Sequence, residues 1–405
     1  MFLKAIPYHV QVRDYFKEQE VSWEFFSKAQ TQEEQLKEFK SALLKNTYLF
    51  TEEGEPMLFA QLGKAKSALE LEALPVYIYQ APYTDEFNAS IAYLEKEAHL
   101  VFSGPVLKLL SDQELLAVLA HELSHIKLYT MLEGELEVAD RIVTAIANNR
   151  YSNNAHYETA RLFKLFTEIF CDRGALLVTQ NADAVVASLV KITTGLDNVH
   201  APSYRQQTET ILNSEQGLKS EGLSHPENFI RCKALDWWIE DEATADKKIA
   251  ELLEKQTTLD QMDIFKQKSL SELTKKVLQL FLKPKWFQSV SVLAQARQYF
   301  PTYQSDEKAV LSIELVDTIK GFDKSIQQYL SYVLLDFVRL DPNLEEIPAG
   351  WAFQFSEDLG LQEHYEKILK KEFKWSEKAL QQNKKKQLAA YYQVKEGAAD
   401  QIYED

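Results

Sequence analysis

The feature that most constrains this chain is the segment HELSH at residues 121–125, which places two histidines and a glutamate on one stretch of expected helix. Residues four positions apart lie on the same face of an α-helix, so His121 and His125 can bind one metal ion together. Glu122 lies beside the first histidine, within reach of a water molecule on that metal but outside the set of ligands. This HExxH pattern is typical of hydrolytic zinc sites in which the glutamate is a base. We therefore expect one Zn²⁺ per chain.

The surrounding residues 111–128, SDQELLAVLAHELSHIKL, predict a helix. Ser111 and Glu114 have the spacing of a capping box, and apolar residues follow at helical intervals. Single histidines on such helices are usually ordinary core or surface residues. Two of them four positions apart, with a carboxylate between them and apolar neighbours, would be costly to bury without a partner. The metal interpretation is therefore favoured over a purely structural one.

A third ligand is expected because catalytic zinc usually has three protein ligands and one open position. Residues 157–178 predict a second amphipathic helix, which carries Glu168 and Asp172 on one face. Apolar residues flank Glu168, so we expect it to complete the zinc site. Asp172 would then accept a hydrogen bond from the far nitrogen of a zinc-binding histidine, with His121 preferred. The alternative is a pair of solvated acids. Competing ligand candidates with less apolar surroundings are Glu133, Glu135, Glu137, Asp140 and His156.

Four sequence blocks between Asn88 and Leu235 resemble the gluzincin metallopeptidases of the HtpX, Oma-type and CAAX prenyl endopeptidase group. They are the segment that begins NASIAYL at residue 88, HELSH, EIFCDR at 168–173 and SHPENFIR at 224–231. The last two stand for the family patterns ExxxD and HPxxxxR. The resemblance implies a zinc-dependent endopeptidase with a zincin-like fold and Glu168 as third ligand.

The same resemblance implies roles for residues that spacing alone does not single out. It places His225 and Arg231 at the active site, where they would stabilise the oxyanion or orient ligands. It also places Asn88, Ala89 and Ser90 at the rim of the substrate site. The chain departs from the family at residue 124, where Ser replaces the usual Gly of HExGH, and at Ala89-Ser90, where relatives have Ala-Phe.

The predicted fold is mainly α with a small mixed or antiparallel β-sheet. Segments 76–80, 88–93 and 99–103 predict its strands, since they are rich in β-branched and aromatic residues or alternate in polarity. We expect a metallopeptidase domain over residues 1–245, with the motif blocks at 88–235, and an all-helical domain over 246–405. Segment 194–222 is expected to be looser. The C-terminal half has no catalytic spacing of His, Cys or acidic residues, so we expect an interaction or regulatory role with a protein partner.

Composition restricts the partners and the location. The net charge of −16 disfavours nucleic acid and anionic membranes as partners. The sequence has no apolar run long enough to span a bilayer and no secretory signal at its start, so we expect a cytoplasmic protein without transmembrane segments. Its two cysteines, Cys171 and Cys232, are expected to be reduced.

The sequence therefore favours a zinc endopeptidase that acts on peptides or proteins. Glu122 would be the general base, and His225 or Arg231 would stabilise the oxyanion. The alternative is a catalytically silent or latent zinc protein whose helical C-terminal half is an interaction or stress-response module. Glu122 favours the enzyme, because a structural zinc site needs no base.

Overall fold

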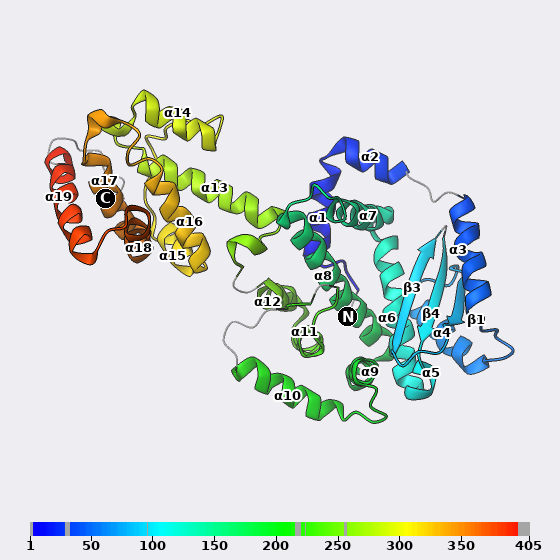
Figure 1. Ribbon diagram of the computed structural model, residues 1–405. Coiled ribbons are helices and arrows are strands. Elements are labelled where there is room, and N and C mark those ends of the chain that lie inside the picture. The colour runs from blue at the N-terminus through cyan, green and yellow to red at the C-terminus, as the bar shows by residue number, and fades with distance from the viewer. Residues whose placement is uncertain are drawn as a thin grey trace. The chain divides into compact units, whose positions relative to one another are not determined.

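The computed structural model describes residues 3–28, 33–94, 96–214, 220–222, 224–254 and 257–395. The chain divides into two compact units, Met1–Lys255 and Gln256–Asp405 (Figure 1). The predicted class, mainly α with a small mixed sheet, is confirmed. The assignment of a peptidase domain to residues 1–245 and of an interaction or regulatory domain to residues 246–405 stays a prediction.

The helices of the first unit surround a central pair, α6 and α8, which pack against each other. Helix α6 begins as predicted, because the Glu114 carboxylate accepts a hydrogen bond of 2.7 Å from the backbone N–H of Ser111. The helices are α1 (Pro7–Lys17), α2 (Glu20–Lys28), α3 (Glu33–Asn46), α4 (Pro56–Ala68), α5 (Val106–Leu109), α6 (Asp112–Thr130), α7 (Glu135–Ala147), α8 (Asn154–Thr179), α9 (Ala182–Thr194), α10 (Ala201–Ser214), α11 (Asn228–Glu240) and α12 (Glu242–Glu254), with a 3-10 turn at Met131–Gly134.

The sheet has the strand order β1-β2-β4-β3. Its strands are β1 (Tyr48–Leu49), β2 (Val76–Gln80), β3 (Asn88–Leu94) and β4 (Glu97–Ser103). Strands β2 and β4 are parallel, whereas β3 pairs with β4 in antiparallel register, with Asn88 opposite Ser103. Helix α3 covers one face through Phe39, whose ring lies 5.5 Å from that of His99. Strand β3 is an edge strand that packs along α6, and this brings its residues close to the HELSH segment.

The sequence predicted three of these strands, but β1 has only two residues and gave no pattern. The expectation of a looser segment over 194–222 is wrong for residues 201–214, which form α10. Ala201 and Thr208 of α10 are buried, and the helix packs against α9 and α11. Because the segment is mostly polar, its sequence did not indicate the narrow face through which α10 packs against α9 and α11.

The elements of the second unit, in its described residues, are all α-helices or 3-10 turns. Its core is aromatic: the indole N–H of Trp351 donates a 2.8 Å hydrogen bond to the backbone oxygen of Phe281, whose ring stacks on Phe355. The elements are α13 (Ile264–Phe281), α14 (Val290–Tyr299), α15 (Ile313–Gly321), α16 (Lys324–Leu335), α17 (Ile347–Asp358), α18 (Gln362–Phe373) and α19 (Glu377–Lys395), with 3-10 turns at Leu259–Gln261, Lys285–Phe287 and Pro342–Leu344. Across the described parts of both units, no helix is long and apolar enough to cross a membrane.

A buried histidine anchors α1 on α8. Nε2 of His9 lies 3.1 Å from the hydroxyl of Thr167, and its ring meets the edge of Phe163. Burial lowers the pKa of His9 from 6.5 to about 3. His9 therefore stays neutral in the folded chain at pH values where it would bind a proton in the unfolded chain.

The first unit should consequently lose stability as the pH falls below about 6.5, because unfolding takes up a proton at His9. Between pH 7.5 and pH 5 this residue alone should lower the free energy of unfolding by about 2 kcal/mol. Urea titrations of the metal-free protein at both pH values would measure the loss. His9→Gln, which cannot bind the proton, should show a loss smaller by that amount, and equal losses in the two proteins would contradict the assignment.

Candidate metal centre and substrate cavity

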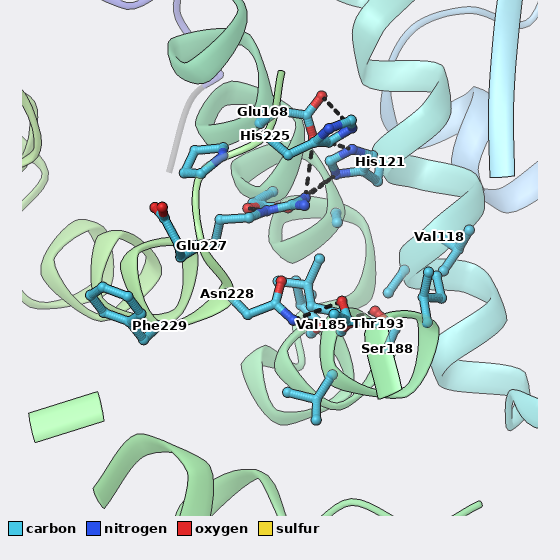
Figure 2. A pocket seen from close by; sticks show the side chains of 18 of the residues that line it. Val118, His121, Glu168, Val185, Ser188, Thr193, His225, Glu227, Asn228 and Phe229 are labelled. Atoms are coloured by element: carbon cyan, nitrogen blue, oxygen red, sulfur yellow. Dashed lines mark hydrogen bonds and ion pairs between the residues drawn. The ribbon is translucent and has the colours of Figure 1, made fainter. Parts of the chain in front are cut away.

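His121 and His125 on α6 converge with Glu168 on α8. Figure 2 shows the His121 and Glu168 side chains close together beside the cavity. Nε2 of His121 lies 3.3 Å from one carboxylate oxygen of Glu168, and Nε2 of His125 lies 3.6 Å from the other. Ligand atoms about 2.05 Å from a tetrahedral zinc ion are about 3.3 Å apart. The two imidazoles and the carboxylate therefore have the spacing of a zinc site.

The charges and unpaired atoms at this point fit a divalent cation. The buried Oε2 of Glu168 accepts no hydrogen bond from the described part of the chain. The carboxylates of Glu122, Glu168 and Asp172 are all buried, and the buried cation among them is Arg231. When all four groups are ionised and both imidazoles are neutral, as metal binding requires, two negative charges stay uncompensated, which is unfavourable in a buried site. A Zn²⁺ ion held by His121, His125 and Glu168 would neutralise them.

Cys171 is a competing donor, since its sulfur and the nitrogens of His121 and His125 all lie within 4.8 Å of one another. Burial, reinforced by the charges of Glu168 and Asp172, raises the pKa of the Cys171 thiol well above its ordinary value. The shorter Glu168 distances favour the carboxylate.

Asp172 connects His121 to Arg231. Its Oδ1 lies 3.0 Å from Nδ1 of His121, and its two oxygens accept hydrogen bonds of 2.6 and 2.7 Å from the Arg231 guanidinium. Burial alone would raise the pKa of Asp172, but Arg231 outweighs burial and lowers it. An ionised Asp172 favours a proton on Nδ1 of His121, which leaves Nε2 as the nitrogen that faces Glu168.

The protonation of the other groups follows from burial and their neighbours. Burial lowers the pKa of His125 to about 4, so this imidazole is neutral at pH 7. For His121 burial acts in the same direction, but the hydrogen bond with Asp172 and the nearby Glu168 carboxylate outweigh it and raise the pKa to about 10 without a metal. Burial raises the pKa of Glu122 to about 7, and this carboxylate accepts no hydrogen bond from a described residue. Glu122 therefore has the properties of a group that can take up and release a proton near neutral pH.

The residues implied by the family resemblance lie in different positions around this centre. The side chain of His225 is 62% exposed, and its Nε2 lies 3.6 Å from Glu168. Arg231 is buried, and its guanidinium is directed at Asp172 and Glu168. Asn88 and Ala89 line the adjacent cavity, whereas Ser90 is not among its lining residues.

Three competing ligand candidates take part in other contacts in the same unit. Glu135 pairs with Arg13 and Lys17, Glu137 pairs with Arg141, and Asp140 accepts a hydrogen bond from the hydroxyl of Tyr129.

A cavity of about 630 Å³ extends from the candidate metal centre toward α9, α10 and α11. Its apolar wall comes mainly from residues that the sequence did not single out, namely Val118, Val185, Leu189, Ile192, Ile211 and Phe229. Asn228 ties α11 to α9, because its side-chain amide donates to the Thr193 hydroxyl at 2.9 Å and to the Leu189 carbonyl at 3.3 Å (Figure 2). The apolar face of α9 was visible in the sequence, but no motif related it to the histidines.

The crossing of α6 and α8 is unusually close behind the metal centre. A Cβ atom added at Gly174 would lie 1.9 Å from the Ser124 hydroxyl oxygen and 2.8 Å from its Cβ. Ser124 is fully buried and donates a 2.7 Å hydrogen bond to the Ala120 carbonyl. Ser124 lies between the two histidines in sequence, and Gly174 follows Asp172 by two residues. The separation of the two ligand-bearing helices therefore depends on small residues at both positions.

The convergent histidines and glutamate, a carboxylate beside them and an adjoining cavity are the features of the HExxH class of metallopeptidases. Residues 60–239 match the model of peptidase family M48, and we assign this segment to that family. The assignment is consistent with the predicted resemblance to HtpX and Oma-type zinc peptidases. The matched segment includes His121, Glu122, His125, Glu168 and Asp172, as well as His225 and Arg231.

The chain is also similar to a protein of Arabidopsis thaliana named plastoglobule-localized metallopeptidase 48, chloroplastic. The two are 26% identical over 197 residues, which cover 45% of this chain and 56% of that protein. The chain thus spans little more than half the length of this curated relative. No solved structure matches the chain.

Gly174→Ala should destabilise the first unit by about 1–3 kcal/mol, since the added methyl group overpacks the contact with Ser124. It should also weaken zinc binding, because the two ligand-bearing helices are forced apart. Ser124→Gly in the same chain should restore much of both properties, whereas Ser124→Ala should not, as it keeps the Cβ. Melting temperatures of the metal-free proteins and chelator competition would measure the effects. A Gly174→Ala protein as stable as wild type would contradict the close crossing.

Asp172→Asn should weaken zinc affinity by about 10–100-fold, because an amide can present an N–H to His121 where an acceptor is needed. Chelator competition at fixed pH would measure this. Asp246→Asn is a matched control. Asp246 pairs at 2.6 Å with Arg173, the residue that follows Asp172 on α8, and it touches neither histidine. Identical titrations of Asp172→Asn and wild type would remove Asp172 from the support of the metal centre.

Proposed function

We propose that this chain is a zinc-dependent endopeptidase whose active site lies between α6 and α8. The observation that carries the proposal is the convergence of His121, His125 and Glu168 beside a cavity, with 3.3 and 3.6 Å between the imidazole nitrogens and the carboxylate oxygens. The M48 match over residues 60–239 supports a metal-dependent protease, and the choice of zinc rests on the two-histidine, one-carboxylate donor set.

His121, His125 and Glu168 would hold the zinc ion. Bound zinc supplies a Lewis acid, which makes water more acidic and polarises the carbonyl group of the scissile peptide bond. Glu122 lines the cavity and is not one of the converging ligands. It takes the proton from the attacking water and passes it to the leaving amine, so that the peptide bond breaks without releasing an amide anion.

His225 and Arg231 have different roles in this proposal. His225 is exposed at the mouth of the site. Its Nε2 can donate a hydrogen bond to the oxygen of the scissile carbonyl group, which becomes an oxyanion when water attacks. Arg231 is buried and engaged with Asp172, so it acts as a positioning residue. By holding Asp172 it keeps His121 in the tautomer that presents Nε2 to the metal.

The substrate would be a peptide in extended conformation. Strand β3 is at the edge of the sheet, with Asn88 and Ala89 at the cavity rim, and such a segment can pair with it there. The apolar wall formed by α9 and α10 favours a bulky apolar side chain next to the scissile bond.

A catalytically silent or latent zinc protein is the alternative. Glu122 and the adjoining cavity support the enzyme, because a site that only stabilises the fold needs neither. A protein partner for residues 246–405 and a cytoplasmic location are further parts of the proposal. The Arabidopsis relative is named as plastoglobule-localized and chloroplastic, so the plastoglobule is a second location to examine.

Glu122→Gln should abolish peptide hydrolysis and leave zinc content and melting temperature nearly unchanged, because glutamine keeps the size of the side chain but cannot act as a base. Hydrolysis of a fluorogenic peptide library, with metal analysis of the same samples, would test this. Glu137→Gln, on the surface of α7, is the control that should keep full activity. Loss of zinc from Glu122→Gln would make Glu122 a ligand, and retained activity would remove it from the mechanism.

A further inference from the structure

The segment Ser220–Gly222, here called the strap, is held by side chains from two helices that carry site residues. Arg161 of α8 donates from one guanidinium nitrogen to the carbonyl oxygens of Ser220 at 3.3 Å and Gly222 at 3.0 Å. Glu227, at the start of α11, accepts hydrogen bonds from the Ser220 hydroxyl at 2.8 Å and from the Glu221 N–H at 2.9 Å. The strap is therefore held by two charged side chains of opposite sign.

Arg161 is itself held in place for this contact. Glu158, one turn earlier on α8, accepts hydrogen bonds of 2.6 to 3.0 Å from two other guanidinium nitrogens of Arg161. A guanidinium paired in this way has little freedom left, and its remaining nitrogen is directed at the strap. Arg161 also lies two helical turns before Glu168. The strap is thus tied to the helix that carries the candidate third ligand.

The strap determines where the backbone of His225 lies. A Cβ atom at Gly222 would be 1.9 Å from the His225 carbonyl oxygen, so the two backbones are in direct contact. The side chain of His225 has little packing of its own: it is 62% exposed, its Nδ1 lies 2.8 Å from the Ser224 hydroxyl, and its Nε2 approaches Glu168. An exposed imidazole has many accessible rotamers, so its placement depends on the backbone that presents it.

We propose that Arg161 is a positioning residue for His225. By anchoring the strap to α8, it holds the imidazole at the mouth of the site, where Nε2 can donate to the oxyanion. The inference rests on the proposed function for the role of His225, but the anchoring of the strap is independent of any activity. Loss of the Arg161 contacts frees the strap, and His225 then spends less time in the productive position.

The first test needs neither metal nor activity. Arg161→Gln in the metal-free full-length protein should speed amide exchange at Glu221 and Gly222 by about tenfold or more, because the strap opens more often. Arg13→Gln is the matched control: the Arg13 side chain is 15% exposed, like that of Arg161, but it pairs with Glu135 and does not touch the strap. Unchanged exchange at Glu221 and Gly222 in the Arg161→Gln protein would overturn the proposal.

The second test is a double-mutant cycle with His225→Ala, measured as kcat/KM on a fluorogenic peptide. Arg161→Gln should lower kcat/KM by about tenfold or more when His225 is present, since small misplacements of a catalytic group have effects of this size. In the His225→Ala background it should have an effect of less than about twofold. Equal losses in both backgrounds would overturn the role, because Arg161 would then act on the fold in general.

Arg161→Lys retains the positive charge beside Glu158 but lacks the several guanidinium nitrogens that bond Glu158 and the strap together, so it should give intermediate effects in both tests. It replaces Arg161→Gln if that protein does not fold. Zinc content and melting temperature should stay near those of wild type. If wild type hydrolyses no peptide, the proposed function fails, and the exchange measurement still decides whether Arg161 anchors the strap.

Discussion

The Asp172 carboxylate, buried between the His121 imidazole and the Arg231 guanidinium, is the contact on which the candidate site depends. The three residues come from α6, α8 and α11, so one set of hydrogen bonds fixes three helices relative to one another. Removing one partner of a buried ion pair typically costs about 3–5 kcal/mol, because the other charge is left uncompensated. Such a contact tolerates little movement, and this rigidity keeps the His121 nitrogen directed at Glu168.

The same region holds more negative than positive charge. Three buried carboxylates around one guanidinium are unfavourable for folding unless a cation or protons compensate them. Binding of a metal ion here would therefore be coupled to folding, since a bound cation stabilises the folded state by its binding free energy. The helical pair α6 and α8 forms the centre of the first unit, so the metal would act on the middle of the core.

The parts of the site that could be predicted from the sequence are those set by helix geometry. The pairs His121 and His125, and Glu168 and Asp172, are each four residues apart, and the periodicity of a helix places each pair on one face. The sequence also predicted that Asp172 approaches a histidine, and the structure brings its oxygen to 3.0 Å from His121. The three longer strands followed from composition, whereas β1 is too short to give a pattern.

The parts that could not be predicted depend on packing between distant segments. The contact of Arg161 with the strap joins residues about 60 positions apart, and no local pattern indicates it. The apolar wall of the cavity comes from α9 and α10. The sequence of α10 is mostly polar, so this helix was not predicted. For residues 246–405 the sequence predicted an all-helical domain, but it has no catalytic spacing of reactive side chains from which a function could be inferred. The aromatic core of the second unit is evident only in the structure.

The close crossing at Ser124 and Gly174 has a consequence for how sequences of this kind can vary. Because the space behind the metal centre holds one hydroxymethyl group, a larger residue at either position is tolerated only when the other becomes smaller. Relatives with glycine at the position of Ser124 can accept alanine or serine opposite it, whereas chains with serine there need glycine. The two positions should therefore covary, and the order of substitutions is restricted. A smaller residue must replace Ser124 on α6 before a larger residue can replace Gly174 on α8.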